Sequence, residues 1–481
     1  MGSGTTRRRF VKTGAGLLAA AAPVAALPGR AKAQDAGAGD PELTRLNGAR
    51  RILLKGGIIL AVDPQVGDFA TGDLLIEAGK IREVGPSIAV SDEAAAVIDA
   101  TNRIVIPGFV DTHSHSYQGL LRDTLPNGIV DPEYNRDIQN NITFHYEPAD
   151  AYAGMLSTAL GLLDMGTTTI VDVSQVNHSP EHSDALIQAM RDGGTRVVAG
   201  YSRGAGPRSQ YPQDVERLRR TYFNSPDQLL TLALGVALDP KIYDFARKNG
   251  LRAIAHLRLN SEPVLALGRA SLLRPGDEFI HCTHLSDAAW RLIKDSGCRT
   301  SHSPPLEMAM AHGMPSIQDA LDHGLRPSLS SDHAATVGQD MFGMMRTAFE
   351  LQRLFILQRR RNGETNTPPL VTPRQVLEFA TINGARCADL DGKIGSLTPG
   401  KEADIVLLST DRINVWPLNN APSAVVNIMN PSHVDTVFVG GKIKKWRGSL
   451  TGIDTARVMR LTREARDAVL RRSGFQVNVV G

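Results

Sequence analysis

Eight apolar segments rich in β-branched residues alternate with segments of helical pattern between residues 104 and 331. This alternation predicts a parallel sheet whose strands are joined by crossover helices. Eight such units predict a TIM-type (β/α)8 barrel, in which functional side chains gather at the C-terminal strand ends. The expected strands are residues 104–115, 167–173, 196–202, 230–238, 251–257, 278–282, 299–303 and 326–331.

Shorter strand patterns flank this region on both sides. Residues 51–62, 73–84 and 95–105 precede it, with a turn expected at Gly79-Lys80. Residues 403–408, 434–439 and 442–446 follow it. Because two segments that are distant in the chain can share one sheet, the sequence predicts a small β domain completed from both ends around an inserted barrel.

The N-terminus has the order of an export signal. Three arginines and a lysine, Arg7 to Lys12, precede an apolar stretch from Gly14 to Leu27 that is too short to span a bilayer. Ala31-Lys32-Ala33 then offers a cleavage site. This order is typical of a twin-arginine signal peptide over residues 1–33, and it predicts a periplasmic or secreted protein without stable membrane insertion after signal removal.

Charge and cysteine content exclude two further classes. The formal charge is +3, and residues 1–34 hold six basic and no acidic side chains, so the mature chain would carry about −3. No polybasic patch with interleaved aromatic residues remains, so nucleic acid is not an expected partner. Cys282, Cys298 and Cys387 are odd in number and widely spaced, and no disulfide framework is expected.

Polar side chains follow four of the expected strands. His113 and His115 close the first strand, and residues two apart on a strand share a face. His256 closes the fifth strand, His281 the sixth and Asp332 the eighth. In a barrel these ends converge, and imidazoles with one carboxylate are ligands for a divalent metal. A helix cap at Asp332 and ordinary core histidines are the structural alternatives.

Several stretches carry a family resemblance. The sequence resembles the amidohydrolase superfamily, in its cytosine deaminase and triazine hydrolase branch, over about residues 50 to 450. The matching stretches are PGFVDTHSH, GTTTIVDV, IAHLRL, IHCTHLS, SHSPP, HGLRPSLSSDHAA, FATINGARCADLDGKIGSLTPGKEADIVLL and VDTVFVGGKIKKW. The resemblance implies a β-sandwich from residues 50–106 and 393–450 around a barrel at 107–392. A linker at 34–49 and a C-terminal tail at 451–481 complete the expected organisation.

The same resemblance implies the roles of the site residues. One divalent metal would be bound by His113, His115, His256 and Asp332. Asp332 and His281 would be catalytic, although His284 is an alternative to His281. Zinc is the expected metal, and iron and manganese stay open because mixed histidine and carboxylate ligands accept all three. Two-metal relatives use a lysine on strand four, and LLTLALGVALD has none.

One position departs from the pattern of the deaminases. They carry His-x-x-Glu on strand five, and here the third residue after His256 is Leu259, which cannot transfer a proton. The sequence therefore favours hydrolysis of an amide, urea or carbamate-like C–N bond in a small organic molecule. The alternatives are a deaminase of an N-heterocycle that uses another acid such as Glu307, and a catalytically inactive exported binding protein.

Five further residues are candidates for substrate contact. They are Arg203, Arg258, His302, Glu307 and His333, each at or just beyond an expected strand end. An inward arginine would favour a carboxylate or carbonyl-rich substrate. Glu307 is expected as a loop carboxylate that meets substrate or solvent. Barrels of this size commonly dimerise within the family, so the resemblance allows a homo-oligomer, although no residue pattern specifies one.

Overall fold

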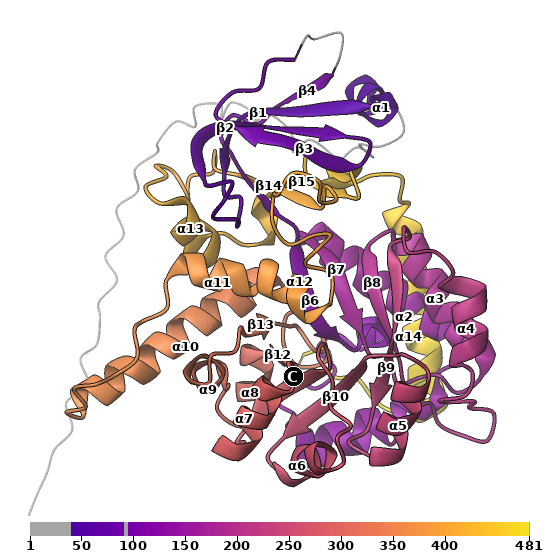
Figure 1. Ribbon diagram of the computed structural model, residues 1–481. Helices are drawn as coiled ribbons and strands as arrows, with labels where there is room; N and C mark the ends of the chain where they lie inside the picture. The colour runs from indigo at the N-terminus through magenta and orange to yellow at the C-terminus, as the bar shows by residue number, and fades with distance from the viewer. Residues whose placement is uncertain (1–39, 91–94, 481) are drawn as a thin grey trace, which may run out of the picture. The chain divides into compact units, whose positions relative to one another are not determined.

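Strands β6 to β13 form one parallel sheet in which each strand pairs with its neighbours in chain order (Figure 1). A parallel bridge between Ser114 and Asp332 joins the two ends of this sheet. The expected TIM-type barrel is confirmed. The strands are β6 Phe109–Ser114, β7 Thr167–Asp172, β8 Arg196–Tyr201, β9 Leu230–Val236, β10 Ala253–Arg258, β11 Glu278–Thr283, β12 Arg299–His302 and β13 Ser328–Leu329. The computed structural model describes residues 40–90 and 95–480, so the expected signal peptide lies outside the described residues.

Helices connect these strands and cover the barrel. Many begin with proline at a first-turn position, where no backbone N–H is needed, and Thr372 caps α11 in a capping box with Gln375. The α-helices are α1 Pro41–Gly48, α2 Pro148–Asp164, α3 Pro180–Gly193, α4 Val215–Tyr222, α5 Pro240–Lys248, α6 Glu262–Arg269, α7 Asp287–Asp295, α8 Pro304–Ala309, α9 Ile317–Asp322, α10 Met341–Arg361, α11 Pro373–Phe379, α12 Ile382–Cys387, α13 Ala421–Ser423 and α14 Thr455–Ser473. The 3₁₀ and π segments are η1 Ser116–Leu120, η2 Val130–Gln139, η3 Ile142–His145, η4 Ala424–Ile428 and η5 Pro431–His433.

A second sheet of nine strands combines both ends of the described chain. Its order is β17-β16-β15-β14-β5-β1-β2-β3, with β4 paired to β1. The antiparallel pair of β5 and β14 joins the segment before the barrel to the segment after it, as expected. The strands are β1 Arg51–Ile59, β2 Phe69–Glu77, β3 Lys80–Gly85, β4 Ala96–Asp99, β5 Arg103–Pro107, β14 Ile405–Ser409, β15 Val434–Val439, β16 Lys442–Trp446 and β17 Ser449–Leu450.

The run expected as a single strand from residue 104 is divided between the two sheets. β5 ends at Pro107 in the second sheet, and β6 begins at Phe109 in the barrel. A Cβ atom on Gly108 would come within 2.1 Å of the Thr168 side chain, so only glycine fits where the chain crosses from one sheet to the other.

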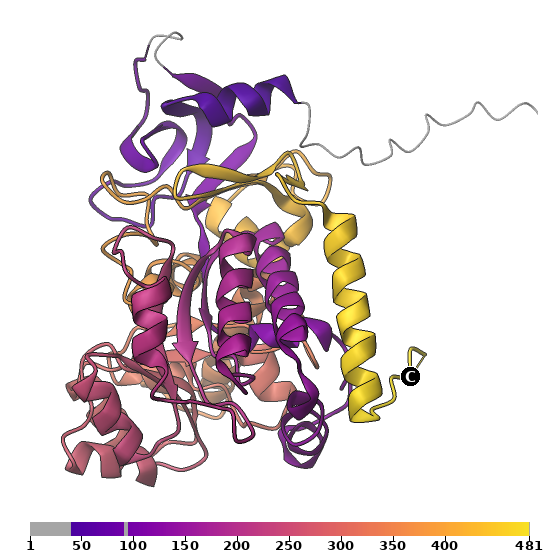
Figure 2. The same cartoon turned by 90° about the vertical axis from the view of Figure 1, so that its right-hand side faces the viewer.

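Four smaller expectations also differ from the structure. The hairpin turn is formed by Ala78 and Gly79, both with positive φ, one residue earlier than expected. The eighth barrel strand is only Ser328–Leu329, since Pro327 before it lacks a backbone donor. Helix α1 lies within the expected linker, and α14 occupies most of the expected tail. Figure 2 shows α14 in yellow beside the barrel helices, where it packs against α2.

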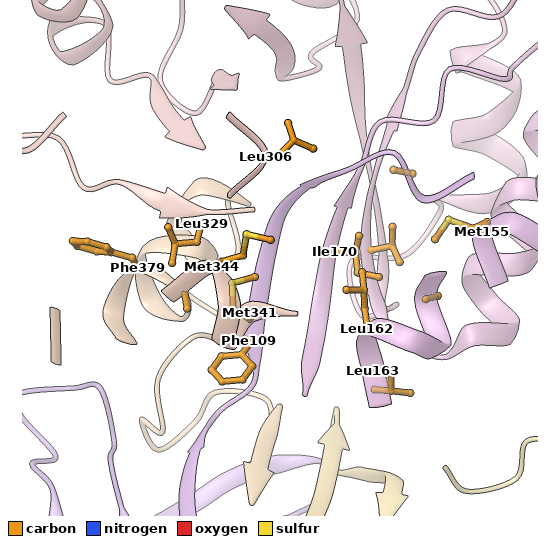
Figure 3. Packing of buried hydrophobic residues seen from close by; sticks show 14 of the residues in the cluster. Phe109, Met155, Leu162, Leu163, Ile170, Leu306, Leu329, Met341, Met344 and Phe379 are labelled. Atoms are coloured by element: carbon orange, nitrogen blue, oxygen red, sulfur yellow. The ribbon is translucent and has the colours of Figure 1, made fainter. Parts of the chain in front are cut away.

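Two of the four hydrophobic clusters in the described residues pack the barrel. Between the barrel and its helices, Phe109, Ile170, Leu329 and Met344 belong to one large cluster (Figure 3). Inside the barrel, apolar strand residues pack against the region of α12, which fills the N-terminal end. The C-terminal end of the barrel therefore remains open for a functional site, and this is the end where barrel enzymes have their active sites.

Buried polar groups add to this framework. Arg196 at the start of β8 donates to Asp404 beside β14 at 3.1 Å and also bonds Glu402, which ties the barrel to the second sheet. Cys282, Cys298 and Cys387 are free and buried. Within residues 40–90 and 95–480, no helix has the length and apolar content needed to cross a bilayer.

Candidate active site

Three histidines from two barrel strands meet at the C-terminal end. His113 is the penultimate residue of β6, His115 follows that strand, and His256 lies on β10. One ring nitrogen from each falls within 4.8 Å of the others. The pairing of β6 with β7 shifts register between Asp111 and Ser114, so the strand is irregular where it reaches the site. The backbone N–H of His115 donates to the Asp332 carbonyl at 2.7 Å, which holds the two chain segments together.

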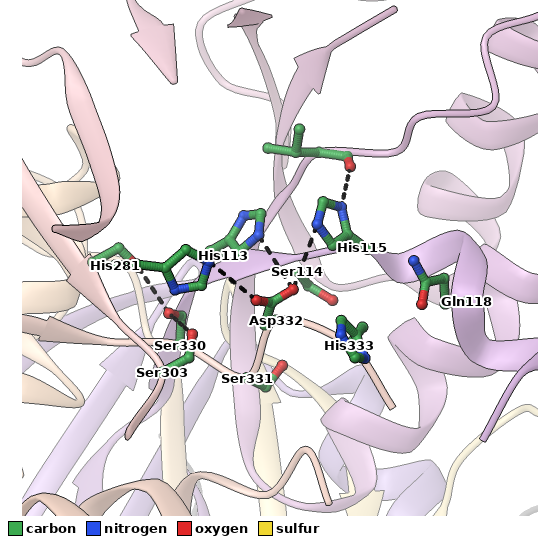
Figure 4. A network of polar contacts seen from close by, with 12 residues as sticks. His113, Ser114, His115, Gln118, His281, Ser303, Ser330, Ser331, Asp332 and His333 are labelled. Atoms are coloured by element: carbon green, nitrogen blue, oxygen red, sulfur yellow. Dashed lines mark hydrogen bonds and ion pairs between the residues drawn. The ribbon is translucent and has the colours of Figure 1, made fainter. Parts of the chain in front are cut away.

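Asp332 brings a carboxylate into this cluster. Its Oδ1 lies 3.4 Å from Nε2 of His115 and 3.6 Å from Nε2 of His113. Figure 4 shows the carboxylate between these two rings and His281. Asp332 has a φ of 57°, a left-handed conformation that is sparsely populated by non-glycine residues and often occurs at functional positions.

The donor set fits a divalent cation. A tetrahedral ion about 2.0 to 2.1 Å from each ligand separates the ligands by roughly 3.4 Å, close to the distances from Asp332 Oδ1 to His113 and His115. Nε2 of His113 and Oδ1 of Asp332 are buried without a hydrogen-bond partner among the described residues, as expected of two atoms that would bind one ion. Nδ1 of His115 bonds the Val173 carbonyl at 2.8 Å, which leaves its Nε2 as the ligand atom.

The protonation states agree with metal binding. Burial lowers the pKa of His113 and lowers that of His256 well below its usual value; it also lowers the pKa of His115 to about 4. Burial alone would raise the pKa of Asp332, but the surrounding imidazoles, with His113 the most important, hold it well below its usual value. Neutral imidazoles and an ionised carboxylate are the forms that bind a metal.

His281 on β11 lies on the other side of Asp332. Its Nε2 is 3.4 Å from Asp332 Oδ2, and its Nδ1 is 3.1 Å from Oε1 of Glu307. His284, the alternative considered from the sequence, is exposed and lies against Gly313. The structure therefore brings His281 to the site and leaves His284 outside it.

Glu307 was expected as a loop carboxylate that meets substrate or solvent, and the structure places it on a helix and away from solvent, while contact with substrate stays a prediction. It lies on α8 and is fully buried, because the chain after β12 turns directly into this helix and directs the side chain toward His281. Leu259, at the position of the deaminase glutamate, is 51% exposed. No carboxylate stands at that position, just beyond the end of β10.

The remaining candidates for substrate contact have different surroundings. Arg203 after β8 is exposed, and Arg258 at the end of β10 is half-buried. His302 is buried, with Nε2 3.0 Å from Oγ1 of Thr300 and Nδ1 3.4 Å from Oγ of Ser316, so both ring nitrogens already have partners. Their roles toward a substrate stay predictions.

Two residues that were not selected from the sequence lie beside the fifth candidate, His333. The ring of Tyr134 on η2 stacks on the His333 ring at 4.6 Å between centroids. Gln118 on η1 donates through Nε2 to the Tyr134 hydroxyl at 2.7 Å, while its Oε1 is buried without a partner among the described residues. No periodicity or motif marks Tyr134, since η2 is an irregular segment between the first two barrel strands.

Comparison with known proteins adds the family. The model of the amidohydrolase family matches residues 104–444, which is most of this chain. The chain belongs to the amidohydrolase family. This amidohydrolase is thus an enzyme for carbon–nitrogen bonds other than peptide bonds, and its superfamily was correctly expected from the sequence.

Relatives of this amidohydrolase span nearly its whole length. It is 27% identical over 452 residues to the 5'-deoxyadenosine deaminase of Methanothermobacter thermautotrophicus, covering 85% of this chain and 97% of the relative. An adenosine deaminase from Xanthomonas campestris with bound zinc has a TM-score of 0.76 at 20% identity, covering 87% and 98% of the two chains. An atrazine chlorohydrolase from Arthrobacter aurescens complexed with zinc has a TM-score of 0.75 at 19% identity, covering 86% and 100%. The two solved structures support the fold.

Proposed function

We propose that this amidohydrolase is an aminohydrolase that removes an exocyclic amine from an N-heterocycle in a small molecule. The observation that carries the proposal is the similarity to the 5'-deoxyadenosine deaminase, which covers 85% of this chain and 97% of that enzyme. The site is compatible with this chemistry, because a ligand set for one metal, an ionised aspartate and a second imidazole lie together at the barrel end.

The proposed cofactor is one zinc ion. His113, His115, His256 and Asp332 would hold it, since the three imidazoles lie within 4.8 Å of one another and Asp332 Oδ1 lies 3.4 and 3.6 Å from two of them. When bound, a divalent ion lowers the pKa of a coordinated water and makes a nucleophile available near neutral pH. Zinc is also the metal named for the two similar solved structures.

The protein side chains would handle the protons. Asp332 is ionised in the folded state and can accept a proton from the attacking water, acting as a general base. His281 is 3.4 Å from Asp332 and is placed to orient the substrate or exchange a proton with it. The neutral rings of His113 and His256 would serve as ligands rather than acids.

This proposal reverses the preference reached from the sequence. Leu259 favoured amide, urea or carbamate cleavage, because the usual proton-transferring glutamate is absent at that position. The similarity to a deaminase over almost the full length supports the alternative more strongly. Both reactions cleave a carbon–nitrogen bond, so a direct comparison of products distinguishes them.

The test measures metal content and ammonia release on protein purified without chelator. The panel holds adenosine, 5'-deoxyadenosine and amino-triazines, compared with N-acyl amides, ureas and carbamates. We expect about one zinc per chain and ammonia from a ring amine. Asp332→Asn should lower kcat by at least about 100-fold, as loss of a general base does. Cleavage of amides, ureas or carbamates with no ring deamination would overturn the proposal.

A further inference from the structure

One buried carboxylate near the site belongs neither to the proposed metal ligands nor to an ion pair with lysine or arginine. Glu307 on α8 is fully buried, and Oε2 of its carboxylate has no hydrogen-bond partner among the described residues. Burying a carboxylate is costly, so such a group needs compensation from specific contacts. Its other oxygen, Oε1, makes those contacts.

Two donors converge on Oε1 of Glu307. The backbone N–H of Ser303 donates to it at 2.8 Å, and Nδ1 of His281 lies 3.1 Å away. Because a carboxylate offers lone pairs, the Nδ1 atom of His281 is the one that carries hydrogen in this bond. The opposite ring nitrogen, Nε2, is then directed at Asp332 Oδ2, 3.4 Å away.

The ring of His281 is also held from the side. His312 packs edge-on against it, with ring centroids 4.5 Å apart and planes at 87°. The backbone N–H of His312 donates to the carbonyl of Glu307 at 2.9 Å. The two residues that contact the His281 ring are therefore hydrogen-bonded to each other. A series of contacts therefore runs from Glu307 through His281 to Asp332, which is one of the proposed metal ligands.

We propose that Glu307 is a positioning residue that fixes His281 in the Nδ1–H tautomer, so that Nε2 relays a proton from Asp332 to the ring nitrogen of the substrate. This inference rests on the proposed deaminase function. It assigns a route for the proton at a site where Leu259 occupies the position of the usual glutamate. In this role Glu307 acts through the imidazole of His281, which its Oε1 contacts at 3.1 Å.

The proposed step balances. Water and an amino-substituted heterocycle give the oxo-heterocycle and ammonia, with a C–O bond formed and the exocyclic C–N bond broken. One water proton passes through Asp332 and Nε2 of His281 to the ring nitrogen and stays there in the product. The other water proton leaves on the amine, which takes the electron pair of the broken bond. No oxidant or reductant is needed.

The first measurement is the tautomer of His281 by ¹⁵N NMR on histidine-labelled full-length protein, with and without zinc. Loss of one signal in His281→Gln identifies the resonance. We expect hydrogen on Nδ1 in the unsubstituted protein and a changed tautomer balance in Glu307→Leu. Hydrogen on Nε2 alone in the unsubstituted protein would overturn the inference, whether or not any variant folds. This readout uses no substrate, so it stands apart from failure of the proposed reaction.

The second measurement compares kcat and KM of three variants after their zinc content is matched. Glu307→Gln keeps an oxygen that can accept from both Ser303 and His281, and we expect kcat to fall by no more than about 10-fold. Glu307→Leu removes the acceptor, and we expect a fall of about 100-fold with little change in KM. Met308→Ala changes the 46% exposed neighbour on α8 and should match the unsubstituted enzyme. Equal kcat in Glu307→Leu and Met308→Ala would refute the positioning role.

Discussion

Four buried histidines near the barrel end are neutral in the folded protein. Burial lowers the pKa of His115 and His333 to about 4 and that of His302 and His312 to about 3. In the unfolded chain each would titrate near 6.5, so unfolding takes up protons below that pH. We therefore expect the contribution of these four rings to the free energy of unfolding to be complete above about pH 6.5 and to be lost as the pH decreases toward 3.

Chemical denaturation of metal-free protein at pH 8, 7, 6, 5 and 4 measures this loss. Each linked proton changes the stability by about 1.4 kcal/mol per pH unit. His302→Asn removes one of the four titrating rings. The slope of unfolding free energy against pH should therefore decrease by the amount that corresponds to at most one proton. The buried carboxyls of Asp111 and Glu278, whose pKa values burial raises to about 7, act in the opposite direction over this range. The comparison with His302→Asn isolates one ring, and an identical pH dependence in the two proteins would contradict a neutral His302.

At the residue scale, the sequence identified side chains at strand ends better than side chains on the connections. His113, His115, His256, His281 and Asp332 were found because a parallel barrel must bring its strand ends together. The surroundings of Glu307 and Arg203 were not predictable. Whether a residue just beyond a strand points inward depends on the path of the connecting segment. Glu307 is buried, whereas Arg203 is exposed.

Helix α14 is expected to stabilise the barrel although it lies in the region predicted as a tail. Val469 is fully buried and Ala465 nearly so, while Arg472 bonds the Asp150 side chain and the His145 carbonyl. Val469→Ala should lower the free energy of unfolding by about 2 kcal/mol through lost burial and a small cavity. Urea denaturation measures it, with Met459→Ala as the control because Met459 is 72% exposed on the same helix. Equal unfolding midpoints in the two variants would mean that α14 contributes no stability.

At the scale of elements, most barrel strands and helices could be predicted because their apolar periodicity is strong. Helix α14 could not be predicted in this way, since its sequence is rich in arginine. Only two of its apolar residues are buried, which is too few for a clear hydrophobic face. Helix α1 is eight residues long and depends on its Asp40 cap, which a polar linker pattern conceals. The division at Gly108 depends on contact with Thr168, a neighbour 60 residues away that no local pattern contains.

At the scale of the whole molecule, we propose that residues 1–33 direct export by the twin-arginine pathway. Replacing Arg7, Arg8 and Arg9 by lysine keeps the charge and should lower the amount of periplasmic protein by at least about 10-fold. Fractionation of a Gram-negative host expressing the full chain measures this, with Arg30→Lys as the control. Unchanged periplasmic protein in the triple variant, or a mature N-terminus far from residue 34, would contradict the proposal.

The three buried cysteines have a consequence for a protein that would cross between redox compartments. Burial raises the pKa of Cys298 to about 12 and raises those of Cys282 and Cys387 as well. Thiolates react with oxidants and thiols do not, so these sulfurs stay unreactive while the fold is intact. Apart from signal removal, the covalent structure would then be the same before and after the proposed export, and maturation would need neither an oxidase nor a disulfide isomerase.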